Sequence, residues 1–262
     1  MRKYIFCVAL ATICVSASAQ QFKIAGTSDE RTKHMDPRHS EFYHPQPAKV
    51  TPGDIRTNSA PSDAIVLFDG KDLSQWVSDK GGESKWIVNG DGTMTVNKED
   101  GNLVTKENFR DFQLHLEWCV PEDIDGEGQA RGNSGVFLQG MYEVQILDSY
   151  NNETYVNGMA ASLYKQNAPL VCPIRKPGEW NVYDIIYTAP TFKEDGTYRT
   201  HPFVTVLFNG VLVQNNTMLV GTTEYVGFPT VQEHGDGPII LQMHGDPSKA
   251  ISFRNIWIRE LN

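Results

Sequence analysis

From about residue 63 to the C-terminus the chain alternates apolar and polar side chains, and this period of two residues constrains the fold more than any other feature. Successive side chains of a β-strand point to opposite faces, so such alternation indicates strands that each bury one face. No stretch of a dozen residues shows the 3.6-residue period of an amphipathic helix. The expected strands, separated by turn residues, are 85–88, 93–96, 112–120, 142–147, 180–187, 203–208, 211–214, 239–244 and 251–261.

Two pairs of these strands are joined by short turns that predict β-hairpins. The sequence Asn-Gly-Asp-Gly at 89–92 joins the first pair, and Asn209-Gly210 joins 203–208 to 211–214. About two hundred residues of short strands predict an all-β protein, a β-sandwich of two antiparallel sheets. That length is enough for a single large hydrophobic core.

The N-terminal residues 1–19 have the features of a signal peptide. A positively charged start precedes an apolar run over residues 4–15, and a small-x-small cleavage motif ends at Ala19. This run is too short to span a bilayer comfortably, and no later segment is long and apolar enough to do so. We therefore expect export to the periplasm or beyond, with a polar proline-containing arm at 20–62 and one domain at 63–262.

The charge balance argues against a nucleic-acid partner. Without Arg2 and Lys3, 21 basic side chains face 32 acidic ones, which gives a net charge of −11. Cys119 and Cys172 remain after the signal peptide is removed, and an exported location permits them either to pair or to stay as buried thiols. The sequence contains no C-x-x-C motif and therefore does not predict a zinc site.

Three expected strands carry polar or ionisable side chains opposite their apolar face. A solvated outer face would normally carry Lys, Thr and Ser, whereas these positions carry Glu, Gln and His. Amides and carboxylates bind sugar hydroxyls, and aromatic rings stack on the C–H faces of sugars. The sequence therefore indicates a carbohydrate-binding face formed by Gln113, His115, Glu117, Glu143, Gln145, Gln242 and His244.

The densest group of functional side chains lies between Arg131 and Asp148. Arg131 and Asn133 precede one strand, and Glu143 and Gln145 share a face of the next, about 7 Å apart by strand rise. Paired carboxylates can act as acid and base, or as nucleophile and acid, in glycoside cleavage. Regular strand geometry would place Glu143 and Asp148 on opposite faces of the sheet. This does not favour their acting together as the two carboxyl groups of a retaining glycosidase.

His244 shares its expected strand face with Gln242 and precedes a Gly-Asp-Pro turn. A lone strand histidine is more often structural, but imidazole suits proton abstraction near neutral pH. His115 and Glu117 are further candidates for substrate binding. Glu117 could instead be the buried partner of an arginine.

A set of short motifs falls in order across residues 65–261. They are Leu67-Phe68-Asp69-Gly70-Lys71-Asp72-Leu73 with Trp76, Asn133-Ser134-Gly135, 142–148, 178–181, Asn209-Gly210, Leu241-Gln242 with His244, and 253–256. Together they resemble the 3-keto-disaccharide hydrolase domain family, common in exported Bacteroidetes proteins. The resemblance implies a concanavalin A-like jelly roll that acts on 3-keto-glycosides without a redox cofactor.

The implied chemistry is an elimination. A carbonyl at C3 makes the C2 proton acidic, so a base can remove it, the C1 substituent can leave, and water can add to the resulting enone. Such an enzyme needs a base, an acid for the leaving oxygen and donors for the enolate oxygen. The residues expected in these roles are His244 or Glu143 as the base, Arg131, Asn133 and Gln145 around the sugar or enolate, and Asp148 in a polarising or structural role.

Two other functions are consistent with the same sequence features: that of a conventional glycoside hydrolase and that of a non-catalytic carbohydrate-binding module. A domain that only displays the N-terminal arm has weaker support. The titratable side chains of Glu143, His244 and Arg131 favour catalysis, because a lectin relies more on amides and aromatic rings. Fold alone cannot separate these functions.

The expected partner is a carbohydrate, with no nucleic acid and no membrane insertion, and a sugar 3-dehydrogenase would supply the keto group. We expect no cofactor and assign no metal ligands, although His115, Glu117 and His244 could ligate a metal if their strands brought them together. The acidic stretch 122–127 could hold a structural Ca²⁺, although such a stretch is more often a solvated loop. A polar insertion at 188–202 and the arm at 20–62 depart from the family pattern and could reshape the site.

Overall fold

The structure, a computed structural model, describes residues 35–261, and the signal peptide expected at 1–19 lies outside them. The chain divides into two compact units, residues 1–49 and 50–262. The described part of the first unit is irregular chain with one 3-10 turn, η1 (Pro37–Ser40). Within the described range, no helix is both long and apolar enough to cross a membrane.

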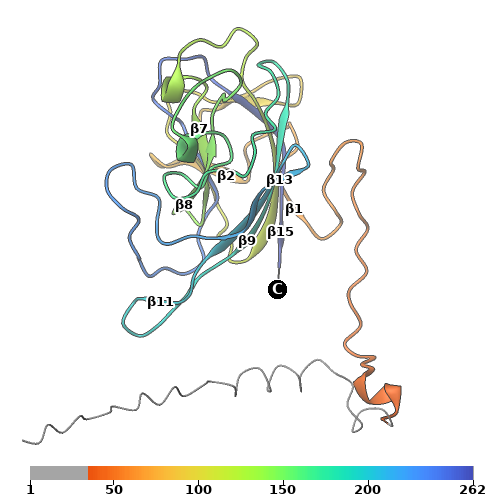
Figure 1. Ribbon diagram of the computed structural model, residues 1–262. Helices are drawn as coiled ribbons and strands as arrows, with labels where there is room; N and C mark the ends of the chain where they lie inside the picture. Colours follow the sequence, from red (N-terminus) through yellow and green to blue (C-terminus); the bar gives the residue numbers. More distant parts are fainter. Residues whose placement is uncertain (1–34, 262) are drawn as a thin grey trace, which may run out of the picture. The chain divides into compact units, whose positions relative to one another are not determined.

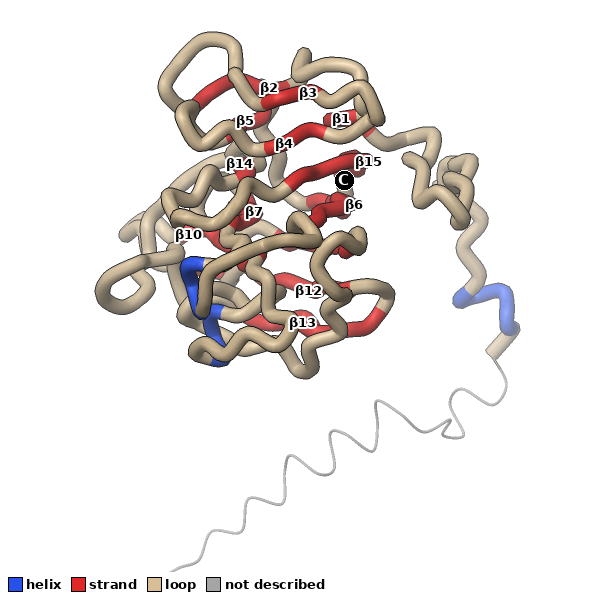
Figure 2. Tube along the Cα trace, turned by 90° about the horizontal axis from the view of Figure 1, so that it is seen from above, coloured by secondary structure: helices blue, strands red, loops and turns tan. Residues whose placement is uncertain are grey.

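The second unit contains two main antiparallel sheets (Figure 1). The larger runs in the order β13-β12-β9-β6-β15-β4-β3, with β1 also paired to β15, and Figure 2 shows β3 and β13 toward its opposite ends. Its strands are β1 (Ile65–Phe68), β3 (Ile87–Val88), β4 (Met94–Thr95), β6 (Phe112–Cys119), β9 (Asn181–Thr188), β12 (Phe203–Phe208), β13 (Val211–Met218) and β15 (Ser252–Glu260).

The smaller sheet has the order β2-β5-β14-β7-β8 and forms the floor of the site described below. Its strands are β2 (Trp76–Ser78), β5 (Leu103–Thr105), β7 (Ser134–Leu138), β8 (Tyr142–Ile146) and β14 (Ile240–Leu241). Outside the two sheets lie the hairpin β10 (Thr191–Phe192)–β11 (Tyr198–Thr200) and the 3-10 turns η2 (Gly128–Ala130) and η3 (Val156–Gly158).

A single core fills the space between the sheets, built from the apolar side of each strand. Trp118, Tyr183 and Phe208 come from three adjacent strands of the larger sheet, and the Tyr183 ring centroid lies 5.6 Å from Trp118 and 4.9 Å from Phe208 in edge-to-face contacts. The Tyr183 hydroxyl donates a 2.9 Å hydrogen bond to the carbonyl of Gln145. The core thereby ties the larger sheet to strand β8 directly beneath the site.

This architecture confirms the predicted all-β jelly-roll sandwich, and both predicted hairpins form. Asn209 and Gly210 have φ angles of 52° and 78°. Both central residues of a type I′ hairpin turn need positive φ, and Asn-Gly is the pair that adopts it most readily. The predicted polar insertion at 188–202 folds back on itself as the β10–β11 hairpin.

The strand predicted at 239–244 is shorter than expected, because regular strand structure ends at Leu241. The Gln242 N–H still bonds the Gly135 carbonyl at 2.9 Å, but the Gly-Asp-Pro sequence that follows His244 turns the chain away. His244 is therefore a loop residue rather than a strand residue.

Residues 50–62, expected to belong to a loose arm, are part of the sandwich unit. The Ser62 N–H bonds the Thr51 carbonyl at 3.0 Å and closes this segment into a loop. The Asn58 carbonyl accepts a 2.9 Å hydrogen bond from the Trp257 indole on the outer face of the larger sheet. Backbone groups, which leave no periodic pattern in the sequence, hold the loop in place.

Candidate functional site

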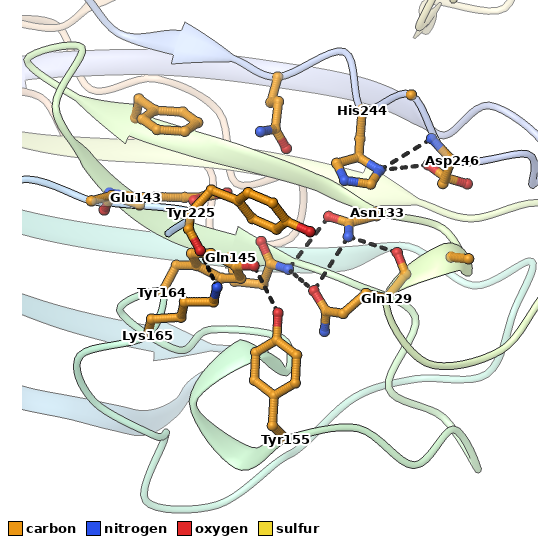
Figure 3. A pocket seen from close by; sticks show the side chains of 15 residues that line it. Gln129, Asn133, Glu143, Gln145, Tyr155, Tyr164, Lys165, Tyr225, His244 and Asp246 are labelled. Carbon is orange, nitrogen blue, oxygen red and sulfur yellow. Dashed lines mark hydrogen bonds and ion pairs between the residues drawn. The ribbon is translucent and has the colours of Figure 1, made fainter. Parts of the chain in front are cut away.

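Strand β8 gives the site its floor. Tyr142, Val144 and Ile146 point into the core, so Glu143 and Gln145 point away from it, on the outer face of the smaller sheet. Above them lies a cavity of about 800 Å³ (Figure 3). Its walls come from four segments that are far apart in the sequence: residues 129, 130 and 133, residues 155, 164 and 165, residues 223 and 225, and residues 242 and 244–246.

Glu143 is only 4% exposed, and burial raises the pKa of its carboxyl to about 8. The Glu143 carboxyl extends over Gly135 of the neighbouring strand β7, where an added Cβ would lie 2.2 Å from Oε1. The Tyr164 N–H bonds the Glu143 carbonyl at 3.1 Å, so the 161–164 segment runs along the free edge of β8. The Glu143 carboxyl is therefore mostly protonated in the cavity at neutral pH.

A network of amides lies beside Glu143. The Gln145 side-chain amide donates to Gln129 Oε1 at 3.1 Å and to the Gly158 carbonyl at 3.3 Å, and Asn133 Nδ2 donates to the Gln129 carbonyl at 2.8 Å. The oxygens Gln145 Oε1 and Gln242 Oε1 are buried without a partner. Buried acceptors without partners are costly, so these two oxygens suit the hydroxyl groups of a bound ligand.

His244 reaches the cavity from the loop after β14, and Figure 3 shows it on the side away from Glu143. Its Nδ1 lies 3.1 Å from Asp246 Oδ2 and 3.2 Å from the Asp246 backbone nitrogen. Burial opposes ionisation of Asp246, but hydrogen bonds from His244 and Ser248 outweigh it and lower the pKa of this carboxyl. The carboxylate can thus orient the imidazole ring.

Sequence reasoning missed a group of tyrosines and a lysine at the cavity. Tyr155 and Tyr164 are joined by a 2.7 Å hydrogen bond between their hydroxyls. The Lys165 ammonium lies 4.5 Å from the Tyr225 ring centroid and bonds the Tyr225 carbonyl. These residues come from loops without a periodic pattern, so nothing in the local sequence marked them.

The amino-acid sequence of this chain also matches a known protein family. Residues 63–259 match the family described as the 3-keto-alpha-glucoside-1,2-lyase-like domain. The chain belongs to this family.

Its relatives include a Bacteroides thetaiotaomicron protein named 3-keto-disaccharide hydrolase, 28% identical over 214 residues, which are 67% of this chain and 68% of that protein. A solved structure from Parabacteroides distasonis, provisionally described as a glycosyl hydrolase, is 66% identical with a TM-score of 0.84, over 87% of this chain and 97% of that one. Another from the same organism, at 22% identity and a TM-score of 0.57 over 76% and 94%, shares the fold.

Arg131 and Asp148, both expected at the site, do not line the cavity of this family member. The chain leaves β8 at Ile146, and the Asp148 side chain turns inward until it is fully buried. Arg131 Nε lies 2.8 Å from Asp148 Oδ2, although burial still raises the pKa of that carboxyl. The position of this pair indicates that it supports the loop leading to Asn133.

His115 and Glu117 lie on the outer face of the larger sheet, so the structure does not bring them together with Glu143. His115 Nδ1 is 2.7 Å from Asp184 Oδ1, and its ring stacks on Trp257 with centroids 5.1 Å apart. Glu117 Oε2 accepts a 2.7 Å bond from Arg254. The alternative of a buried carboxylate paired with an arginine therefore describes Glu117.

No group of three or more His, Cys, Asp or Glu among residues 35–261 could hold a metal ion. In the acidic stretch 122–127, Asp123 pairs with Lys249. Structural calcium at this stretch stays a prediction. Cys119 and Cys172 are both free thiols.

Proposed function

We propose that this protein cleaves 3-keto-glycosides by β-elimination followed by hydration. The observation that carries the proposal is the placement, in one cavity, of a mostly protonated carboxyl at Glu143 and a carboxylate-supported imidazole at His244. An elimination needs both a proton donor and a proton acceptor; a protonated carboxyl can donate a proton, and an imidazole is a group that can accept one.

In the proposed reaction His244 takes the C2 proton, and the C2–H electrons form the enolate of the C3 ketone. The enolate expels the C1 oxygen, which takes a proton from Glu143, and a C1=C2 double bond conjugated to the ketone is left. Water then adds across that bond, its hydroxyl to C1 and its proton to C2. The net reaction is hydrolysis to a 3-keto sugar and an alcohol.

The remaining cavity groups suit binding of the sugar. Gln145 Oε1 and Gln242 Oε1 would accept bonds from sugar hydroxyls. The Lys165 ammonium supplies the positive charge that a developing enolate oxygen requires. Arg131 is assigned no direct contact with the sugar, because it lies outside the cavity lining.

A conventional glycoside hydrolase would need two carboxyl groups free to flank the scissile bond. Besides Glu143, the cavity lining contains one further carboxyl, Asp246. Its side chain is 2% exposed and is bound by His244, Ser248 and Lys98. Asp246 is therefore poorly placed to act as a nucleophile or to activate water at the anomeric carbon.

The proposal also implies a source of substrate. A ketone at C3 must be made by oxidation of the corresponding hydroxyl, so a sugar 3-dehydrogenase would act before this enzyme. We further propose that both reactions take place outside the cytoplasm, on the basis of the signal-peptide features of residues 1–19.

The test compares 4-nitrophenyl glucoside with its 3-keto counterpart, using the purified protein and its Glu143→Gln and His244→Gln variants. Release of nitrophenol only from the keto sugar, lost in His244→Gln, would support the proposal. Loss of activity in Glu143→Gln is measured on methyl 3-keto-glucoside, because nitrophenolate leaves without a proton donor whereas an alkyl alcohol does not. Cleavage of the plain glucoside would indicate an ordinary hydrolase. Binding of sugar by calorimetry without turnover of either compound would instead indicate a binding module.

Isotope exchange separates elimination from direct hydrolysis of the keto sugar. In D₂O, elimination and hydration place deuterium at C2 of the product, whereas direct displacement at C1 leaves the C2 proton in place. A parallel incubation of the 3-keto product with the His244→Gln variant measures spontaneous exchange. Product without deuterium above that background would contradict the elimination.

A further inference from the structure

Two loops at the mouth of the cavity expose large apolar side chains. On one loop Tyr225, Val226 and Phe228 are 76%, 81% and 88% exposed. On the other, Tyr155 and Val156 are 41% and 65% exposed. Tyr155 and Tyr225 also line the cavity, and Figure 3 shows their rings beside the amide network, so this apolar rim is continuous with the polar floor.

Local contacts hold both loops in place. The Thr222 N–H bonds the Thr230 carbonyl at 2.8 Å and closes the base of the loop that carries Phe228. The ring of Tyr155 packs against Gly158, where an added Cβ would lie only 1.9 Å from Tyr155 Cε2. The rim is thus ordered before a ligand binds, so less conformational entropy of the loops is lost on binding.

The rim and the floor differ in chemistry. The floor and walls of the cavity offer a carboxyl, amides and an imidazole, which suit the hydroxyl and keto groups of a sugar. The rim offers aromatic and aliphatic surface, and clustered exposed apolar residues beside a pocket mark a binding surface. A ligand that matches both parts is polar at one end and apolar at the other.

We propose that the apolar rim binds the aglycone, so that this protein prefers glycosides with a large apolar aglycone to those with a small one. The inference rests on the proposed function, which places the sugar ring on the floor. The C1 substituent then extends toward the mouth of the cavity, where Tyr225 and Tyr155 stand.

The test uses methyl and 2-phenylethyl 3-keto-glucosides. Both release an alkyl alcohol, so intrinsic reactivity differs little while apolar area differs greatly. We expect KM to be about tenfold lower for the phenylethyl compound, from roughly 25 cal/mol for each Å² of apolar surface buried. The Val226→Ser/Phe228→Ser double variant should lose this preference and keep its constants for the methyl compound.

The matched control is Ile87→Ser, which removes a 54% exposed apolar side chain from β3, away from the cavity. Equal KM values for the two compounds, or a double variant that keeps the preference, would overturn the inference.

Binding of the two unoxidised glucosides, measured by calorimetry, is a second readout without catalysis. If neither keto sugar is cleaved but phenylethyl glucoside still binds about tenfold more tightly, the proposed function fails and the aglycone surface stands. Equal binding would overturn the surface too.

Discussion

The Glu143 carboxyl extends across Gly135 on the neighbouring strand, so closely that a Cβ on Gly135 would lie 2.2 Å from Glu143 Oε1. The register of the β7–β8 pair produces this contact, because Gly135 is opposite Gln145 and Phe137 is opposite Glu143. The absence of a side chain at position 135 therefore leaves room for the carboxyl in the cavity floor.

Gly135→Ala should displace the Glu143 carboxyl without disturbing the strand, since the backbone at 135 does not need a positive φ. We expect kcat/KM on a 3-keto-glycoside to fall about 100-fold or more, as is usual when a general acid is lost. Gly90→Ala is the matched control, because an added Cβ there meets no atom within 4 Å. Full activity in Gly135→Ala would contradict the role given to Glu143.

The pKa of Glu143, raised to about 8 by burial, predicts the alkaline limb of the activity profile. The acid must be protonated to act, so ionisation of the Glu143 carboxyl does not limit kcat/KM below about pH 8. Above that kcat/KM should fall as the carboxyl ionises. Steady-state kinetics from pH 5 to 10 would measure this limb. The residual activity of Glu143→Gln should lack it, and an unchanged limb in that variant would assign the ionisation to another group.

Asp246 is predicted to act through His244 rather than on the substrate. Asp246→Asn removes the carboxylate beside His244 Nδ1, so we expect kcat to fall about tenfold or more while KM changes little. Lys98→Ala is the control, because Lys98 also contacts Asp246 Oδ1, at 3.4 Å, but does not line the cavity. Equal losses in the two variants would indicate that Asp246 only supports the loop.

Alternation along the sequence was sufficient to predict the sandwich and the outward direction of Glu143 and Gln145. It could not predict which of the two outer faces a strand belongs to, because a sandwich has two and their polar residues alternate in the same way. His115 and Glu117 match Glu143 and Gln145 in composition and period, yet they lie on the other sheet. Strand order, which depends on long-range pairing, separates the two sets.

The loops of the site were harder to anticipate than its strands. Lys165 and Tyr225 meet although they are sixty positions apart, and each lies in a segment without periodicity. Asp246, by contrast, lies only two residues after His244, within the Gly-Asp-Pro turn that follows this histidine in the sequence. Turns formed by neighbouring residues can be predicted from the sequence, whereas contacts between distant loops depend on the overall fold.

Glu117 is predicted to stabilise the fold without contributing to catalysis. Burial alone would raise the pKa of its carboxyl, but the imidazole of His115, 3.7 Å away, and hydrogen bonds from Asn255 and Arg254 outweigh burial and lower it to about 2. A carboxyl whose pKa is lowered in the folded state stabilises the protein above its unfolded value of about 4.5, and this stabilisation is lost as the pH falls toward 2.

Glu117→Gln should therefore lower the free energy of unfolding by about 2 kcal/mol near neutral pH, because the buried side chain loses its charge-assisted hydrogen bonds from Arg254 and Asn255. The difference between the two proteins should shrink as the pH falls from about 4.5 toward 2. Urea unfolding at several pH values would measure it. Gln113→Ala, on the same face of β6, is the control and should have a smaller effect.

The same Glu117→Gln variant should keep kcat and KM within about twofold of the parent values wherever it remains folded, because Glu117 lies on the sheet opposite the cavity. A large fall in kcat in the fully folded variant would show that Glu117 contributes to catalysis, through an effect transmitted across the core from the opposite sheet. A parallel loss of stability and activity only near the unfolding midpoint would agree with a purely structural role.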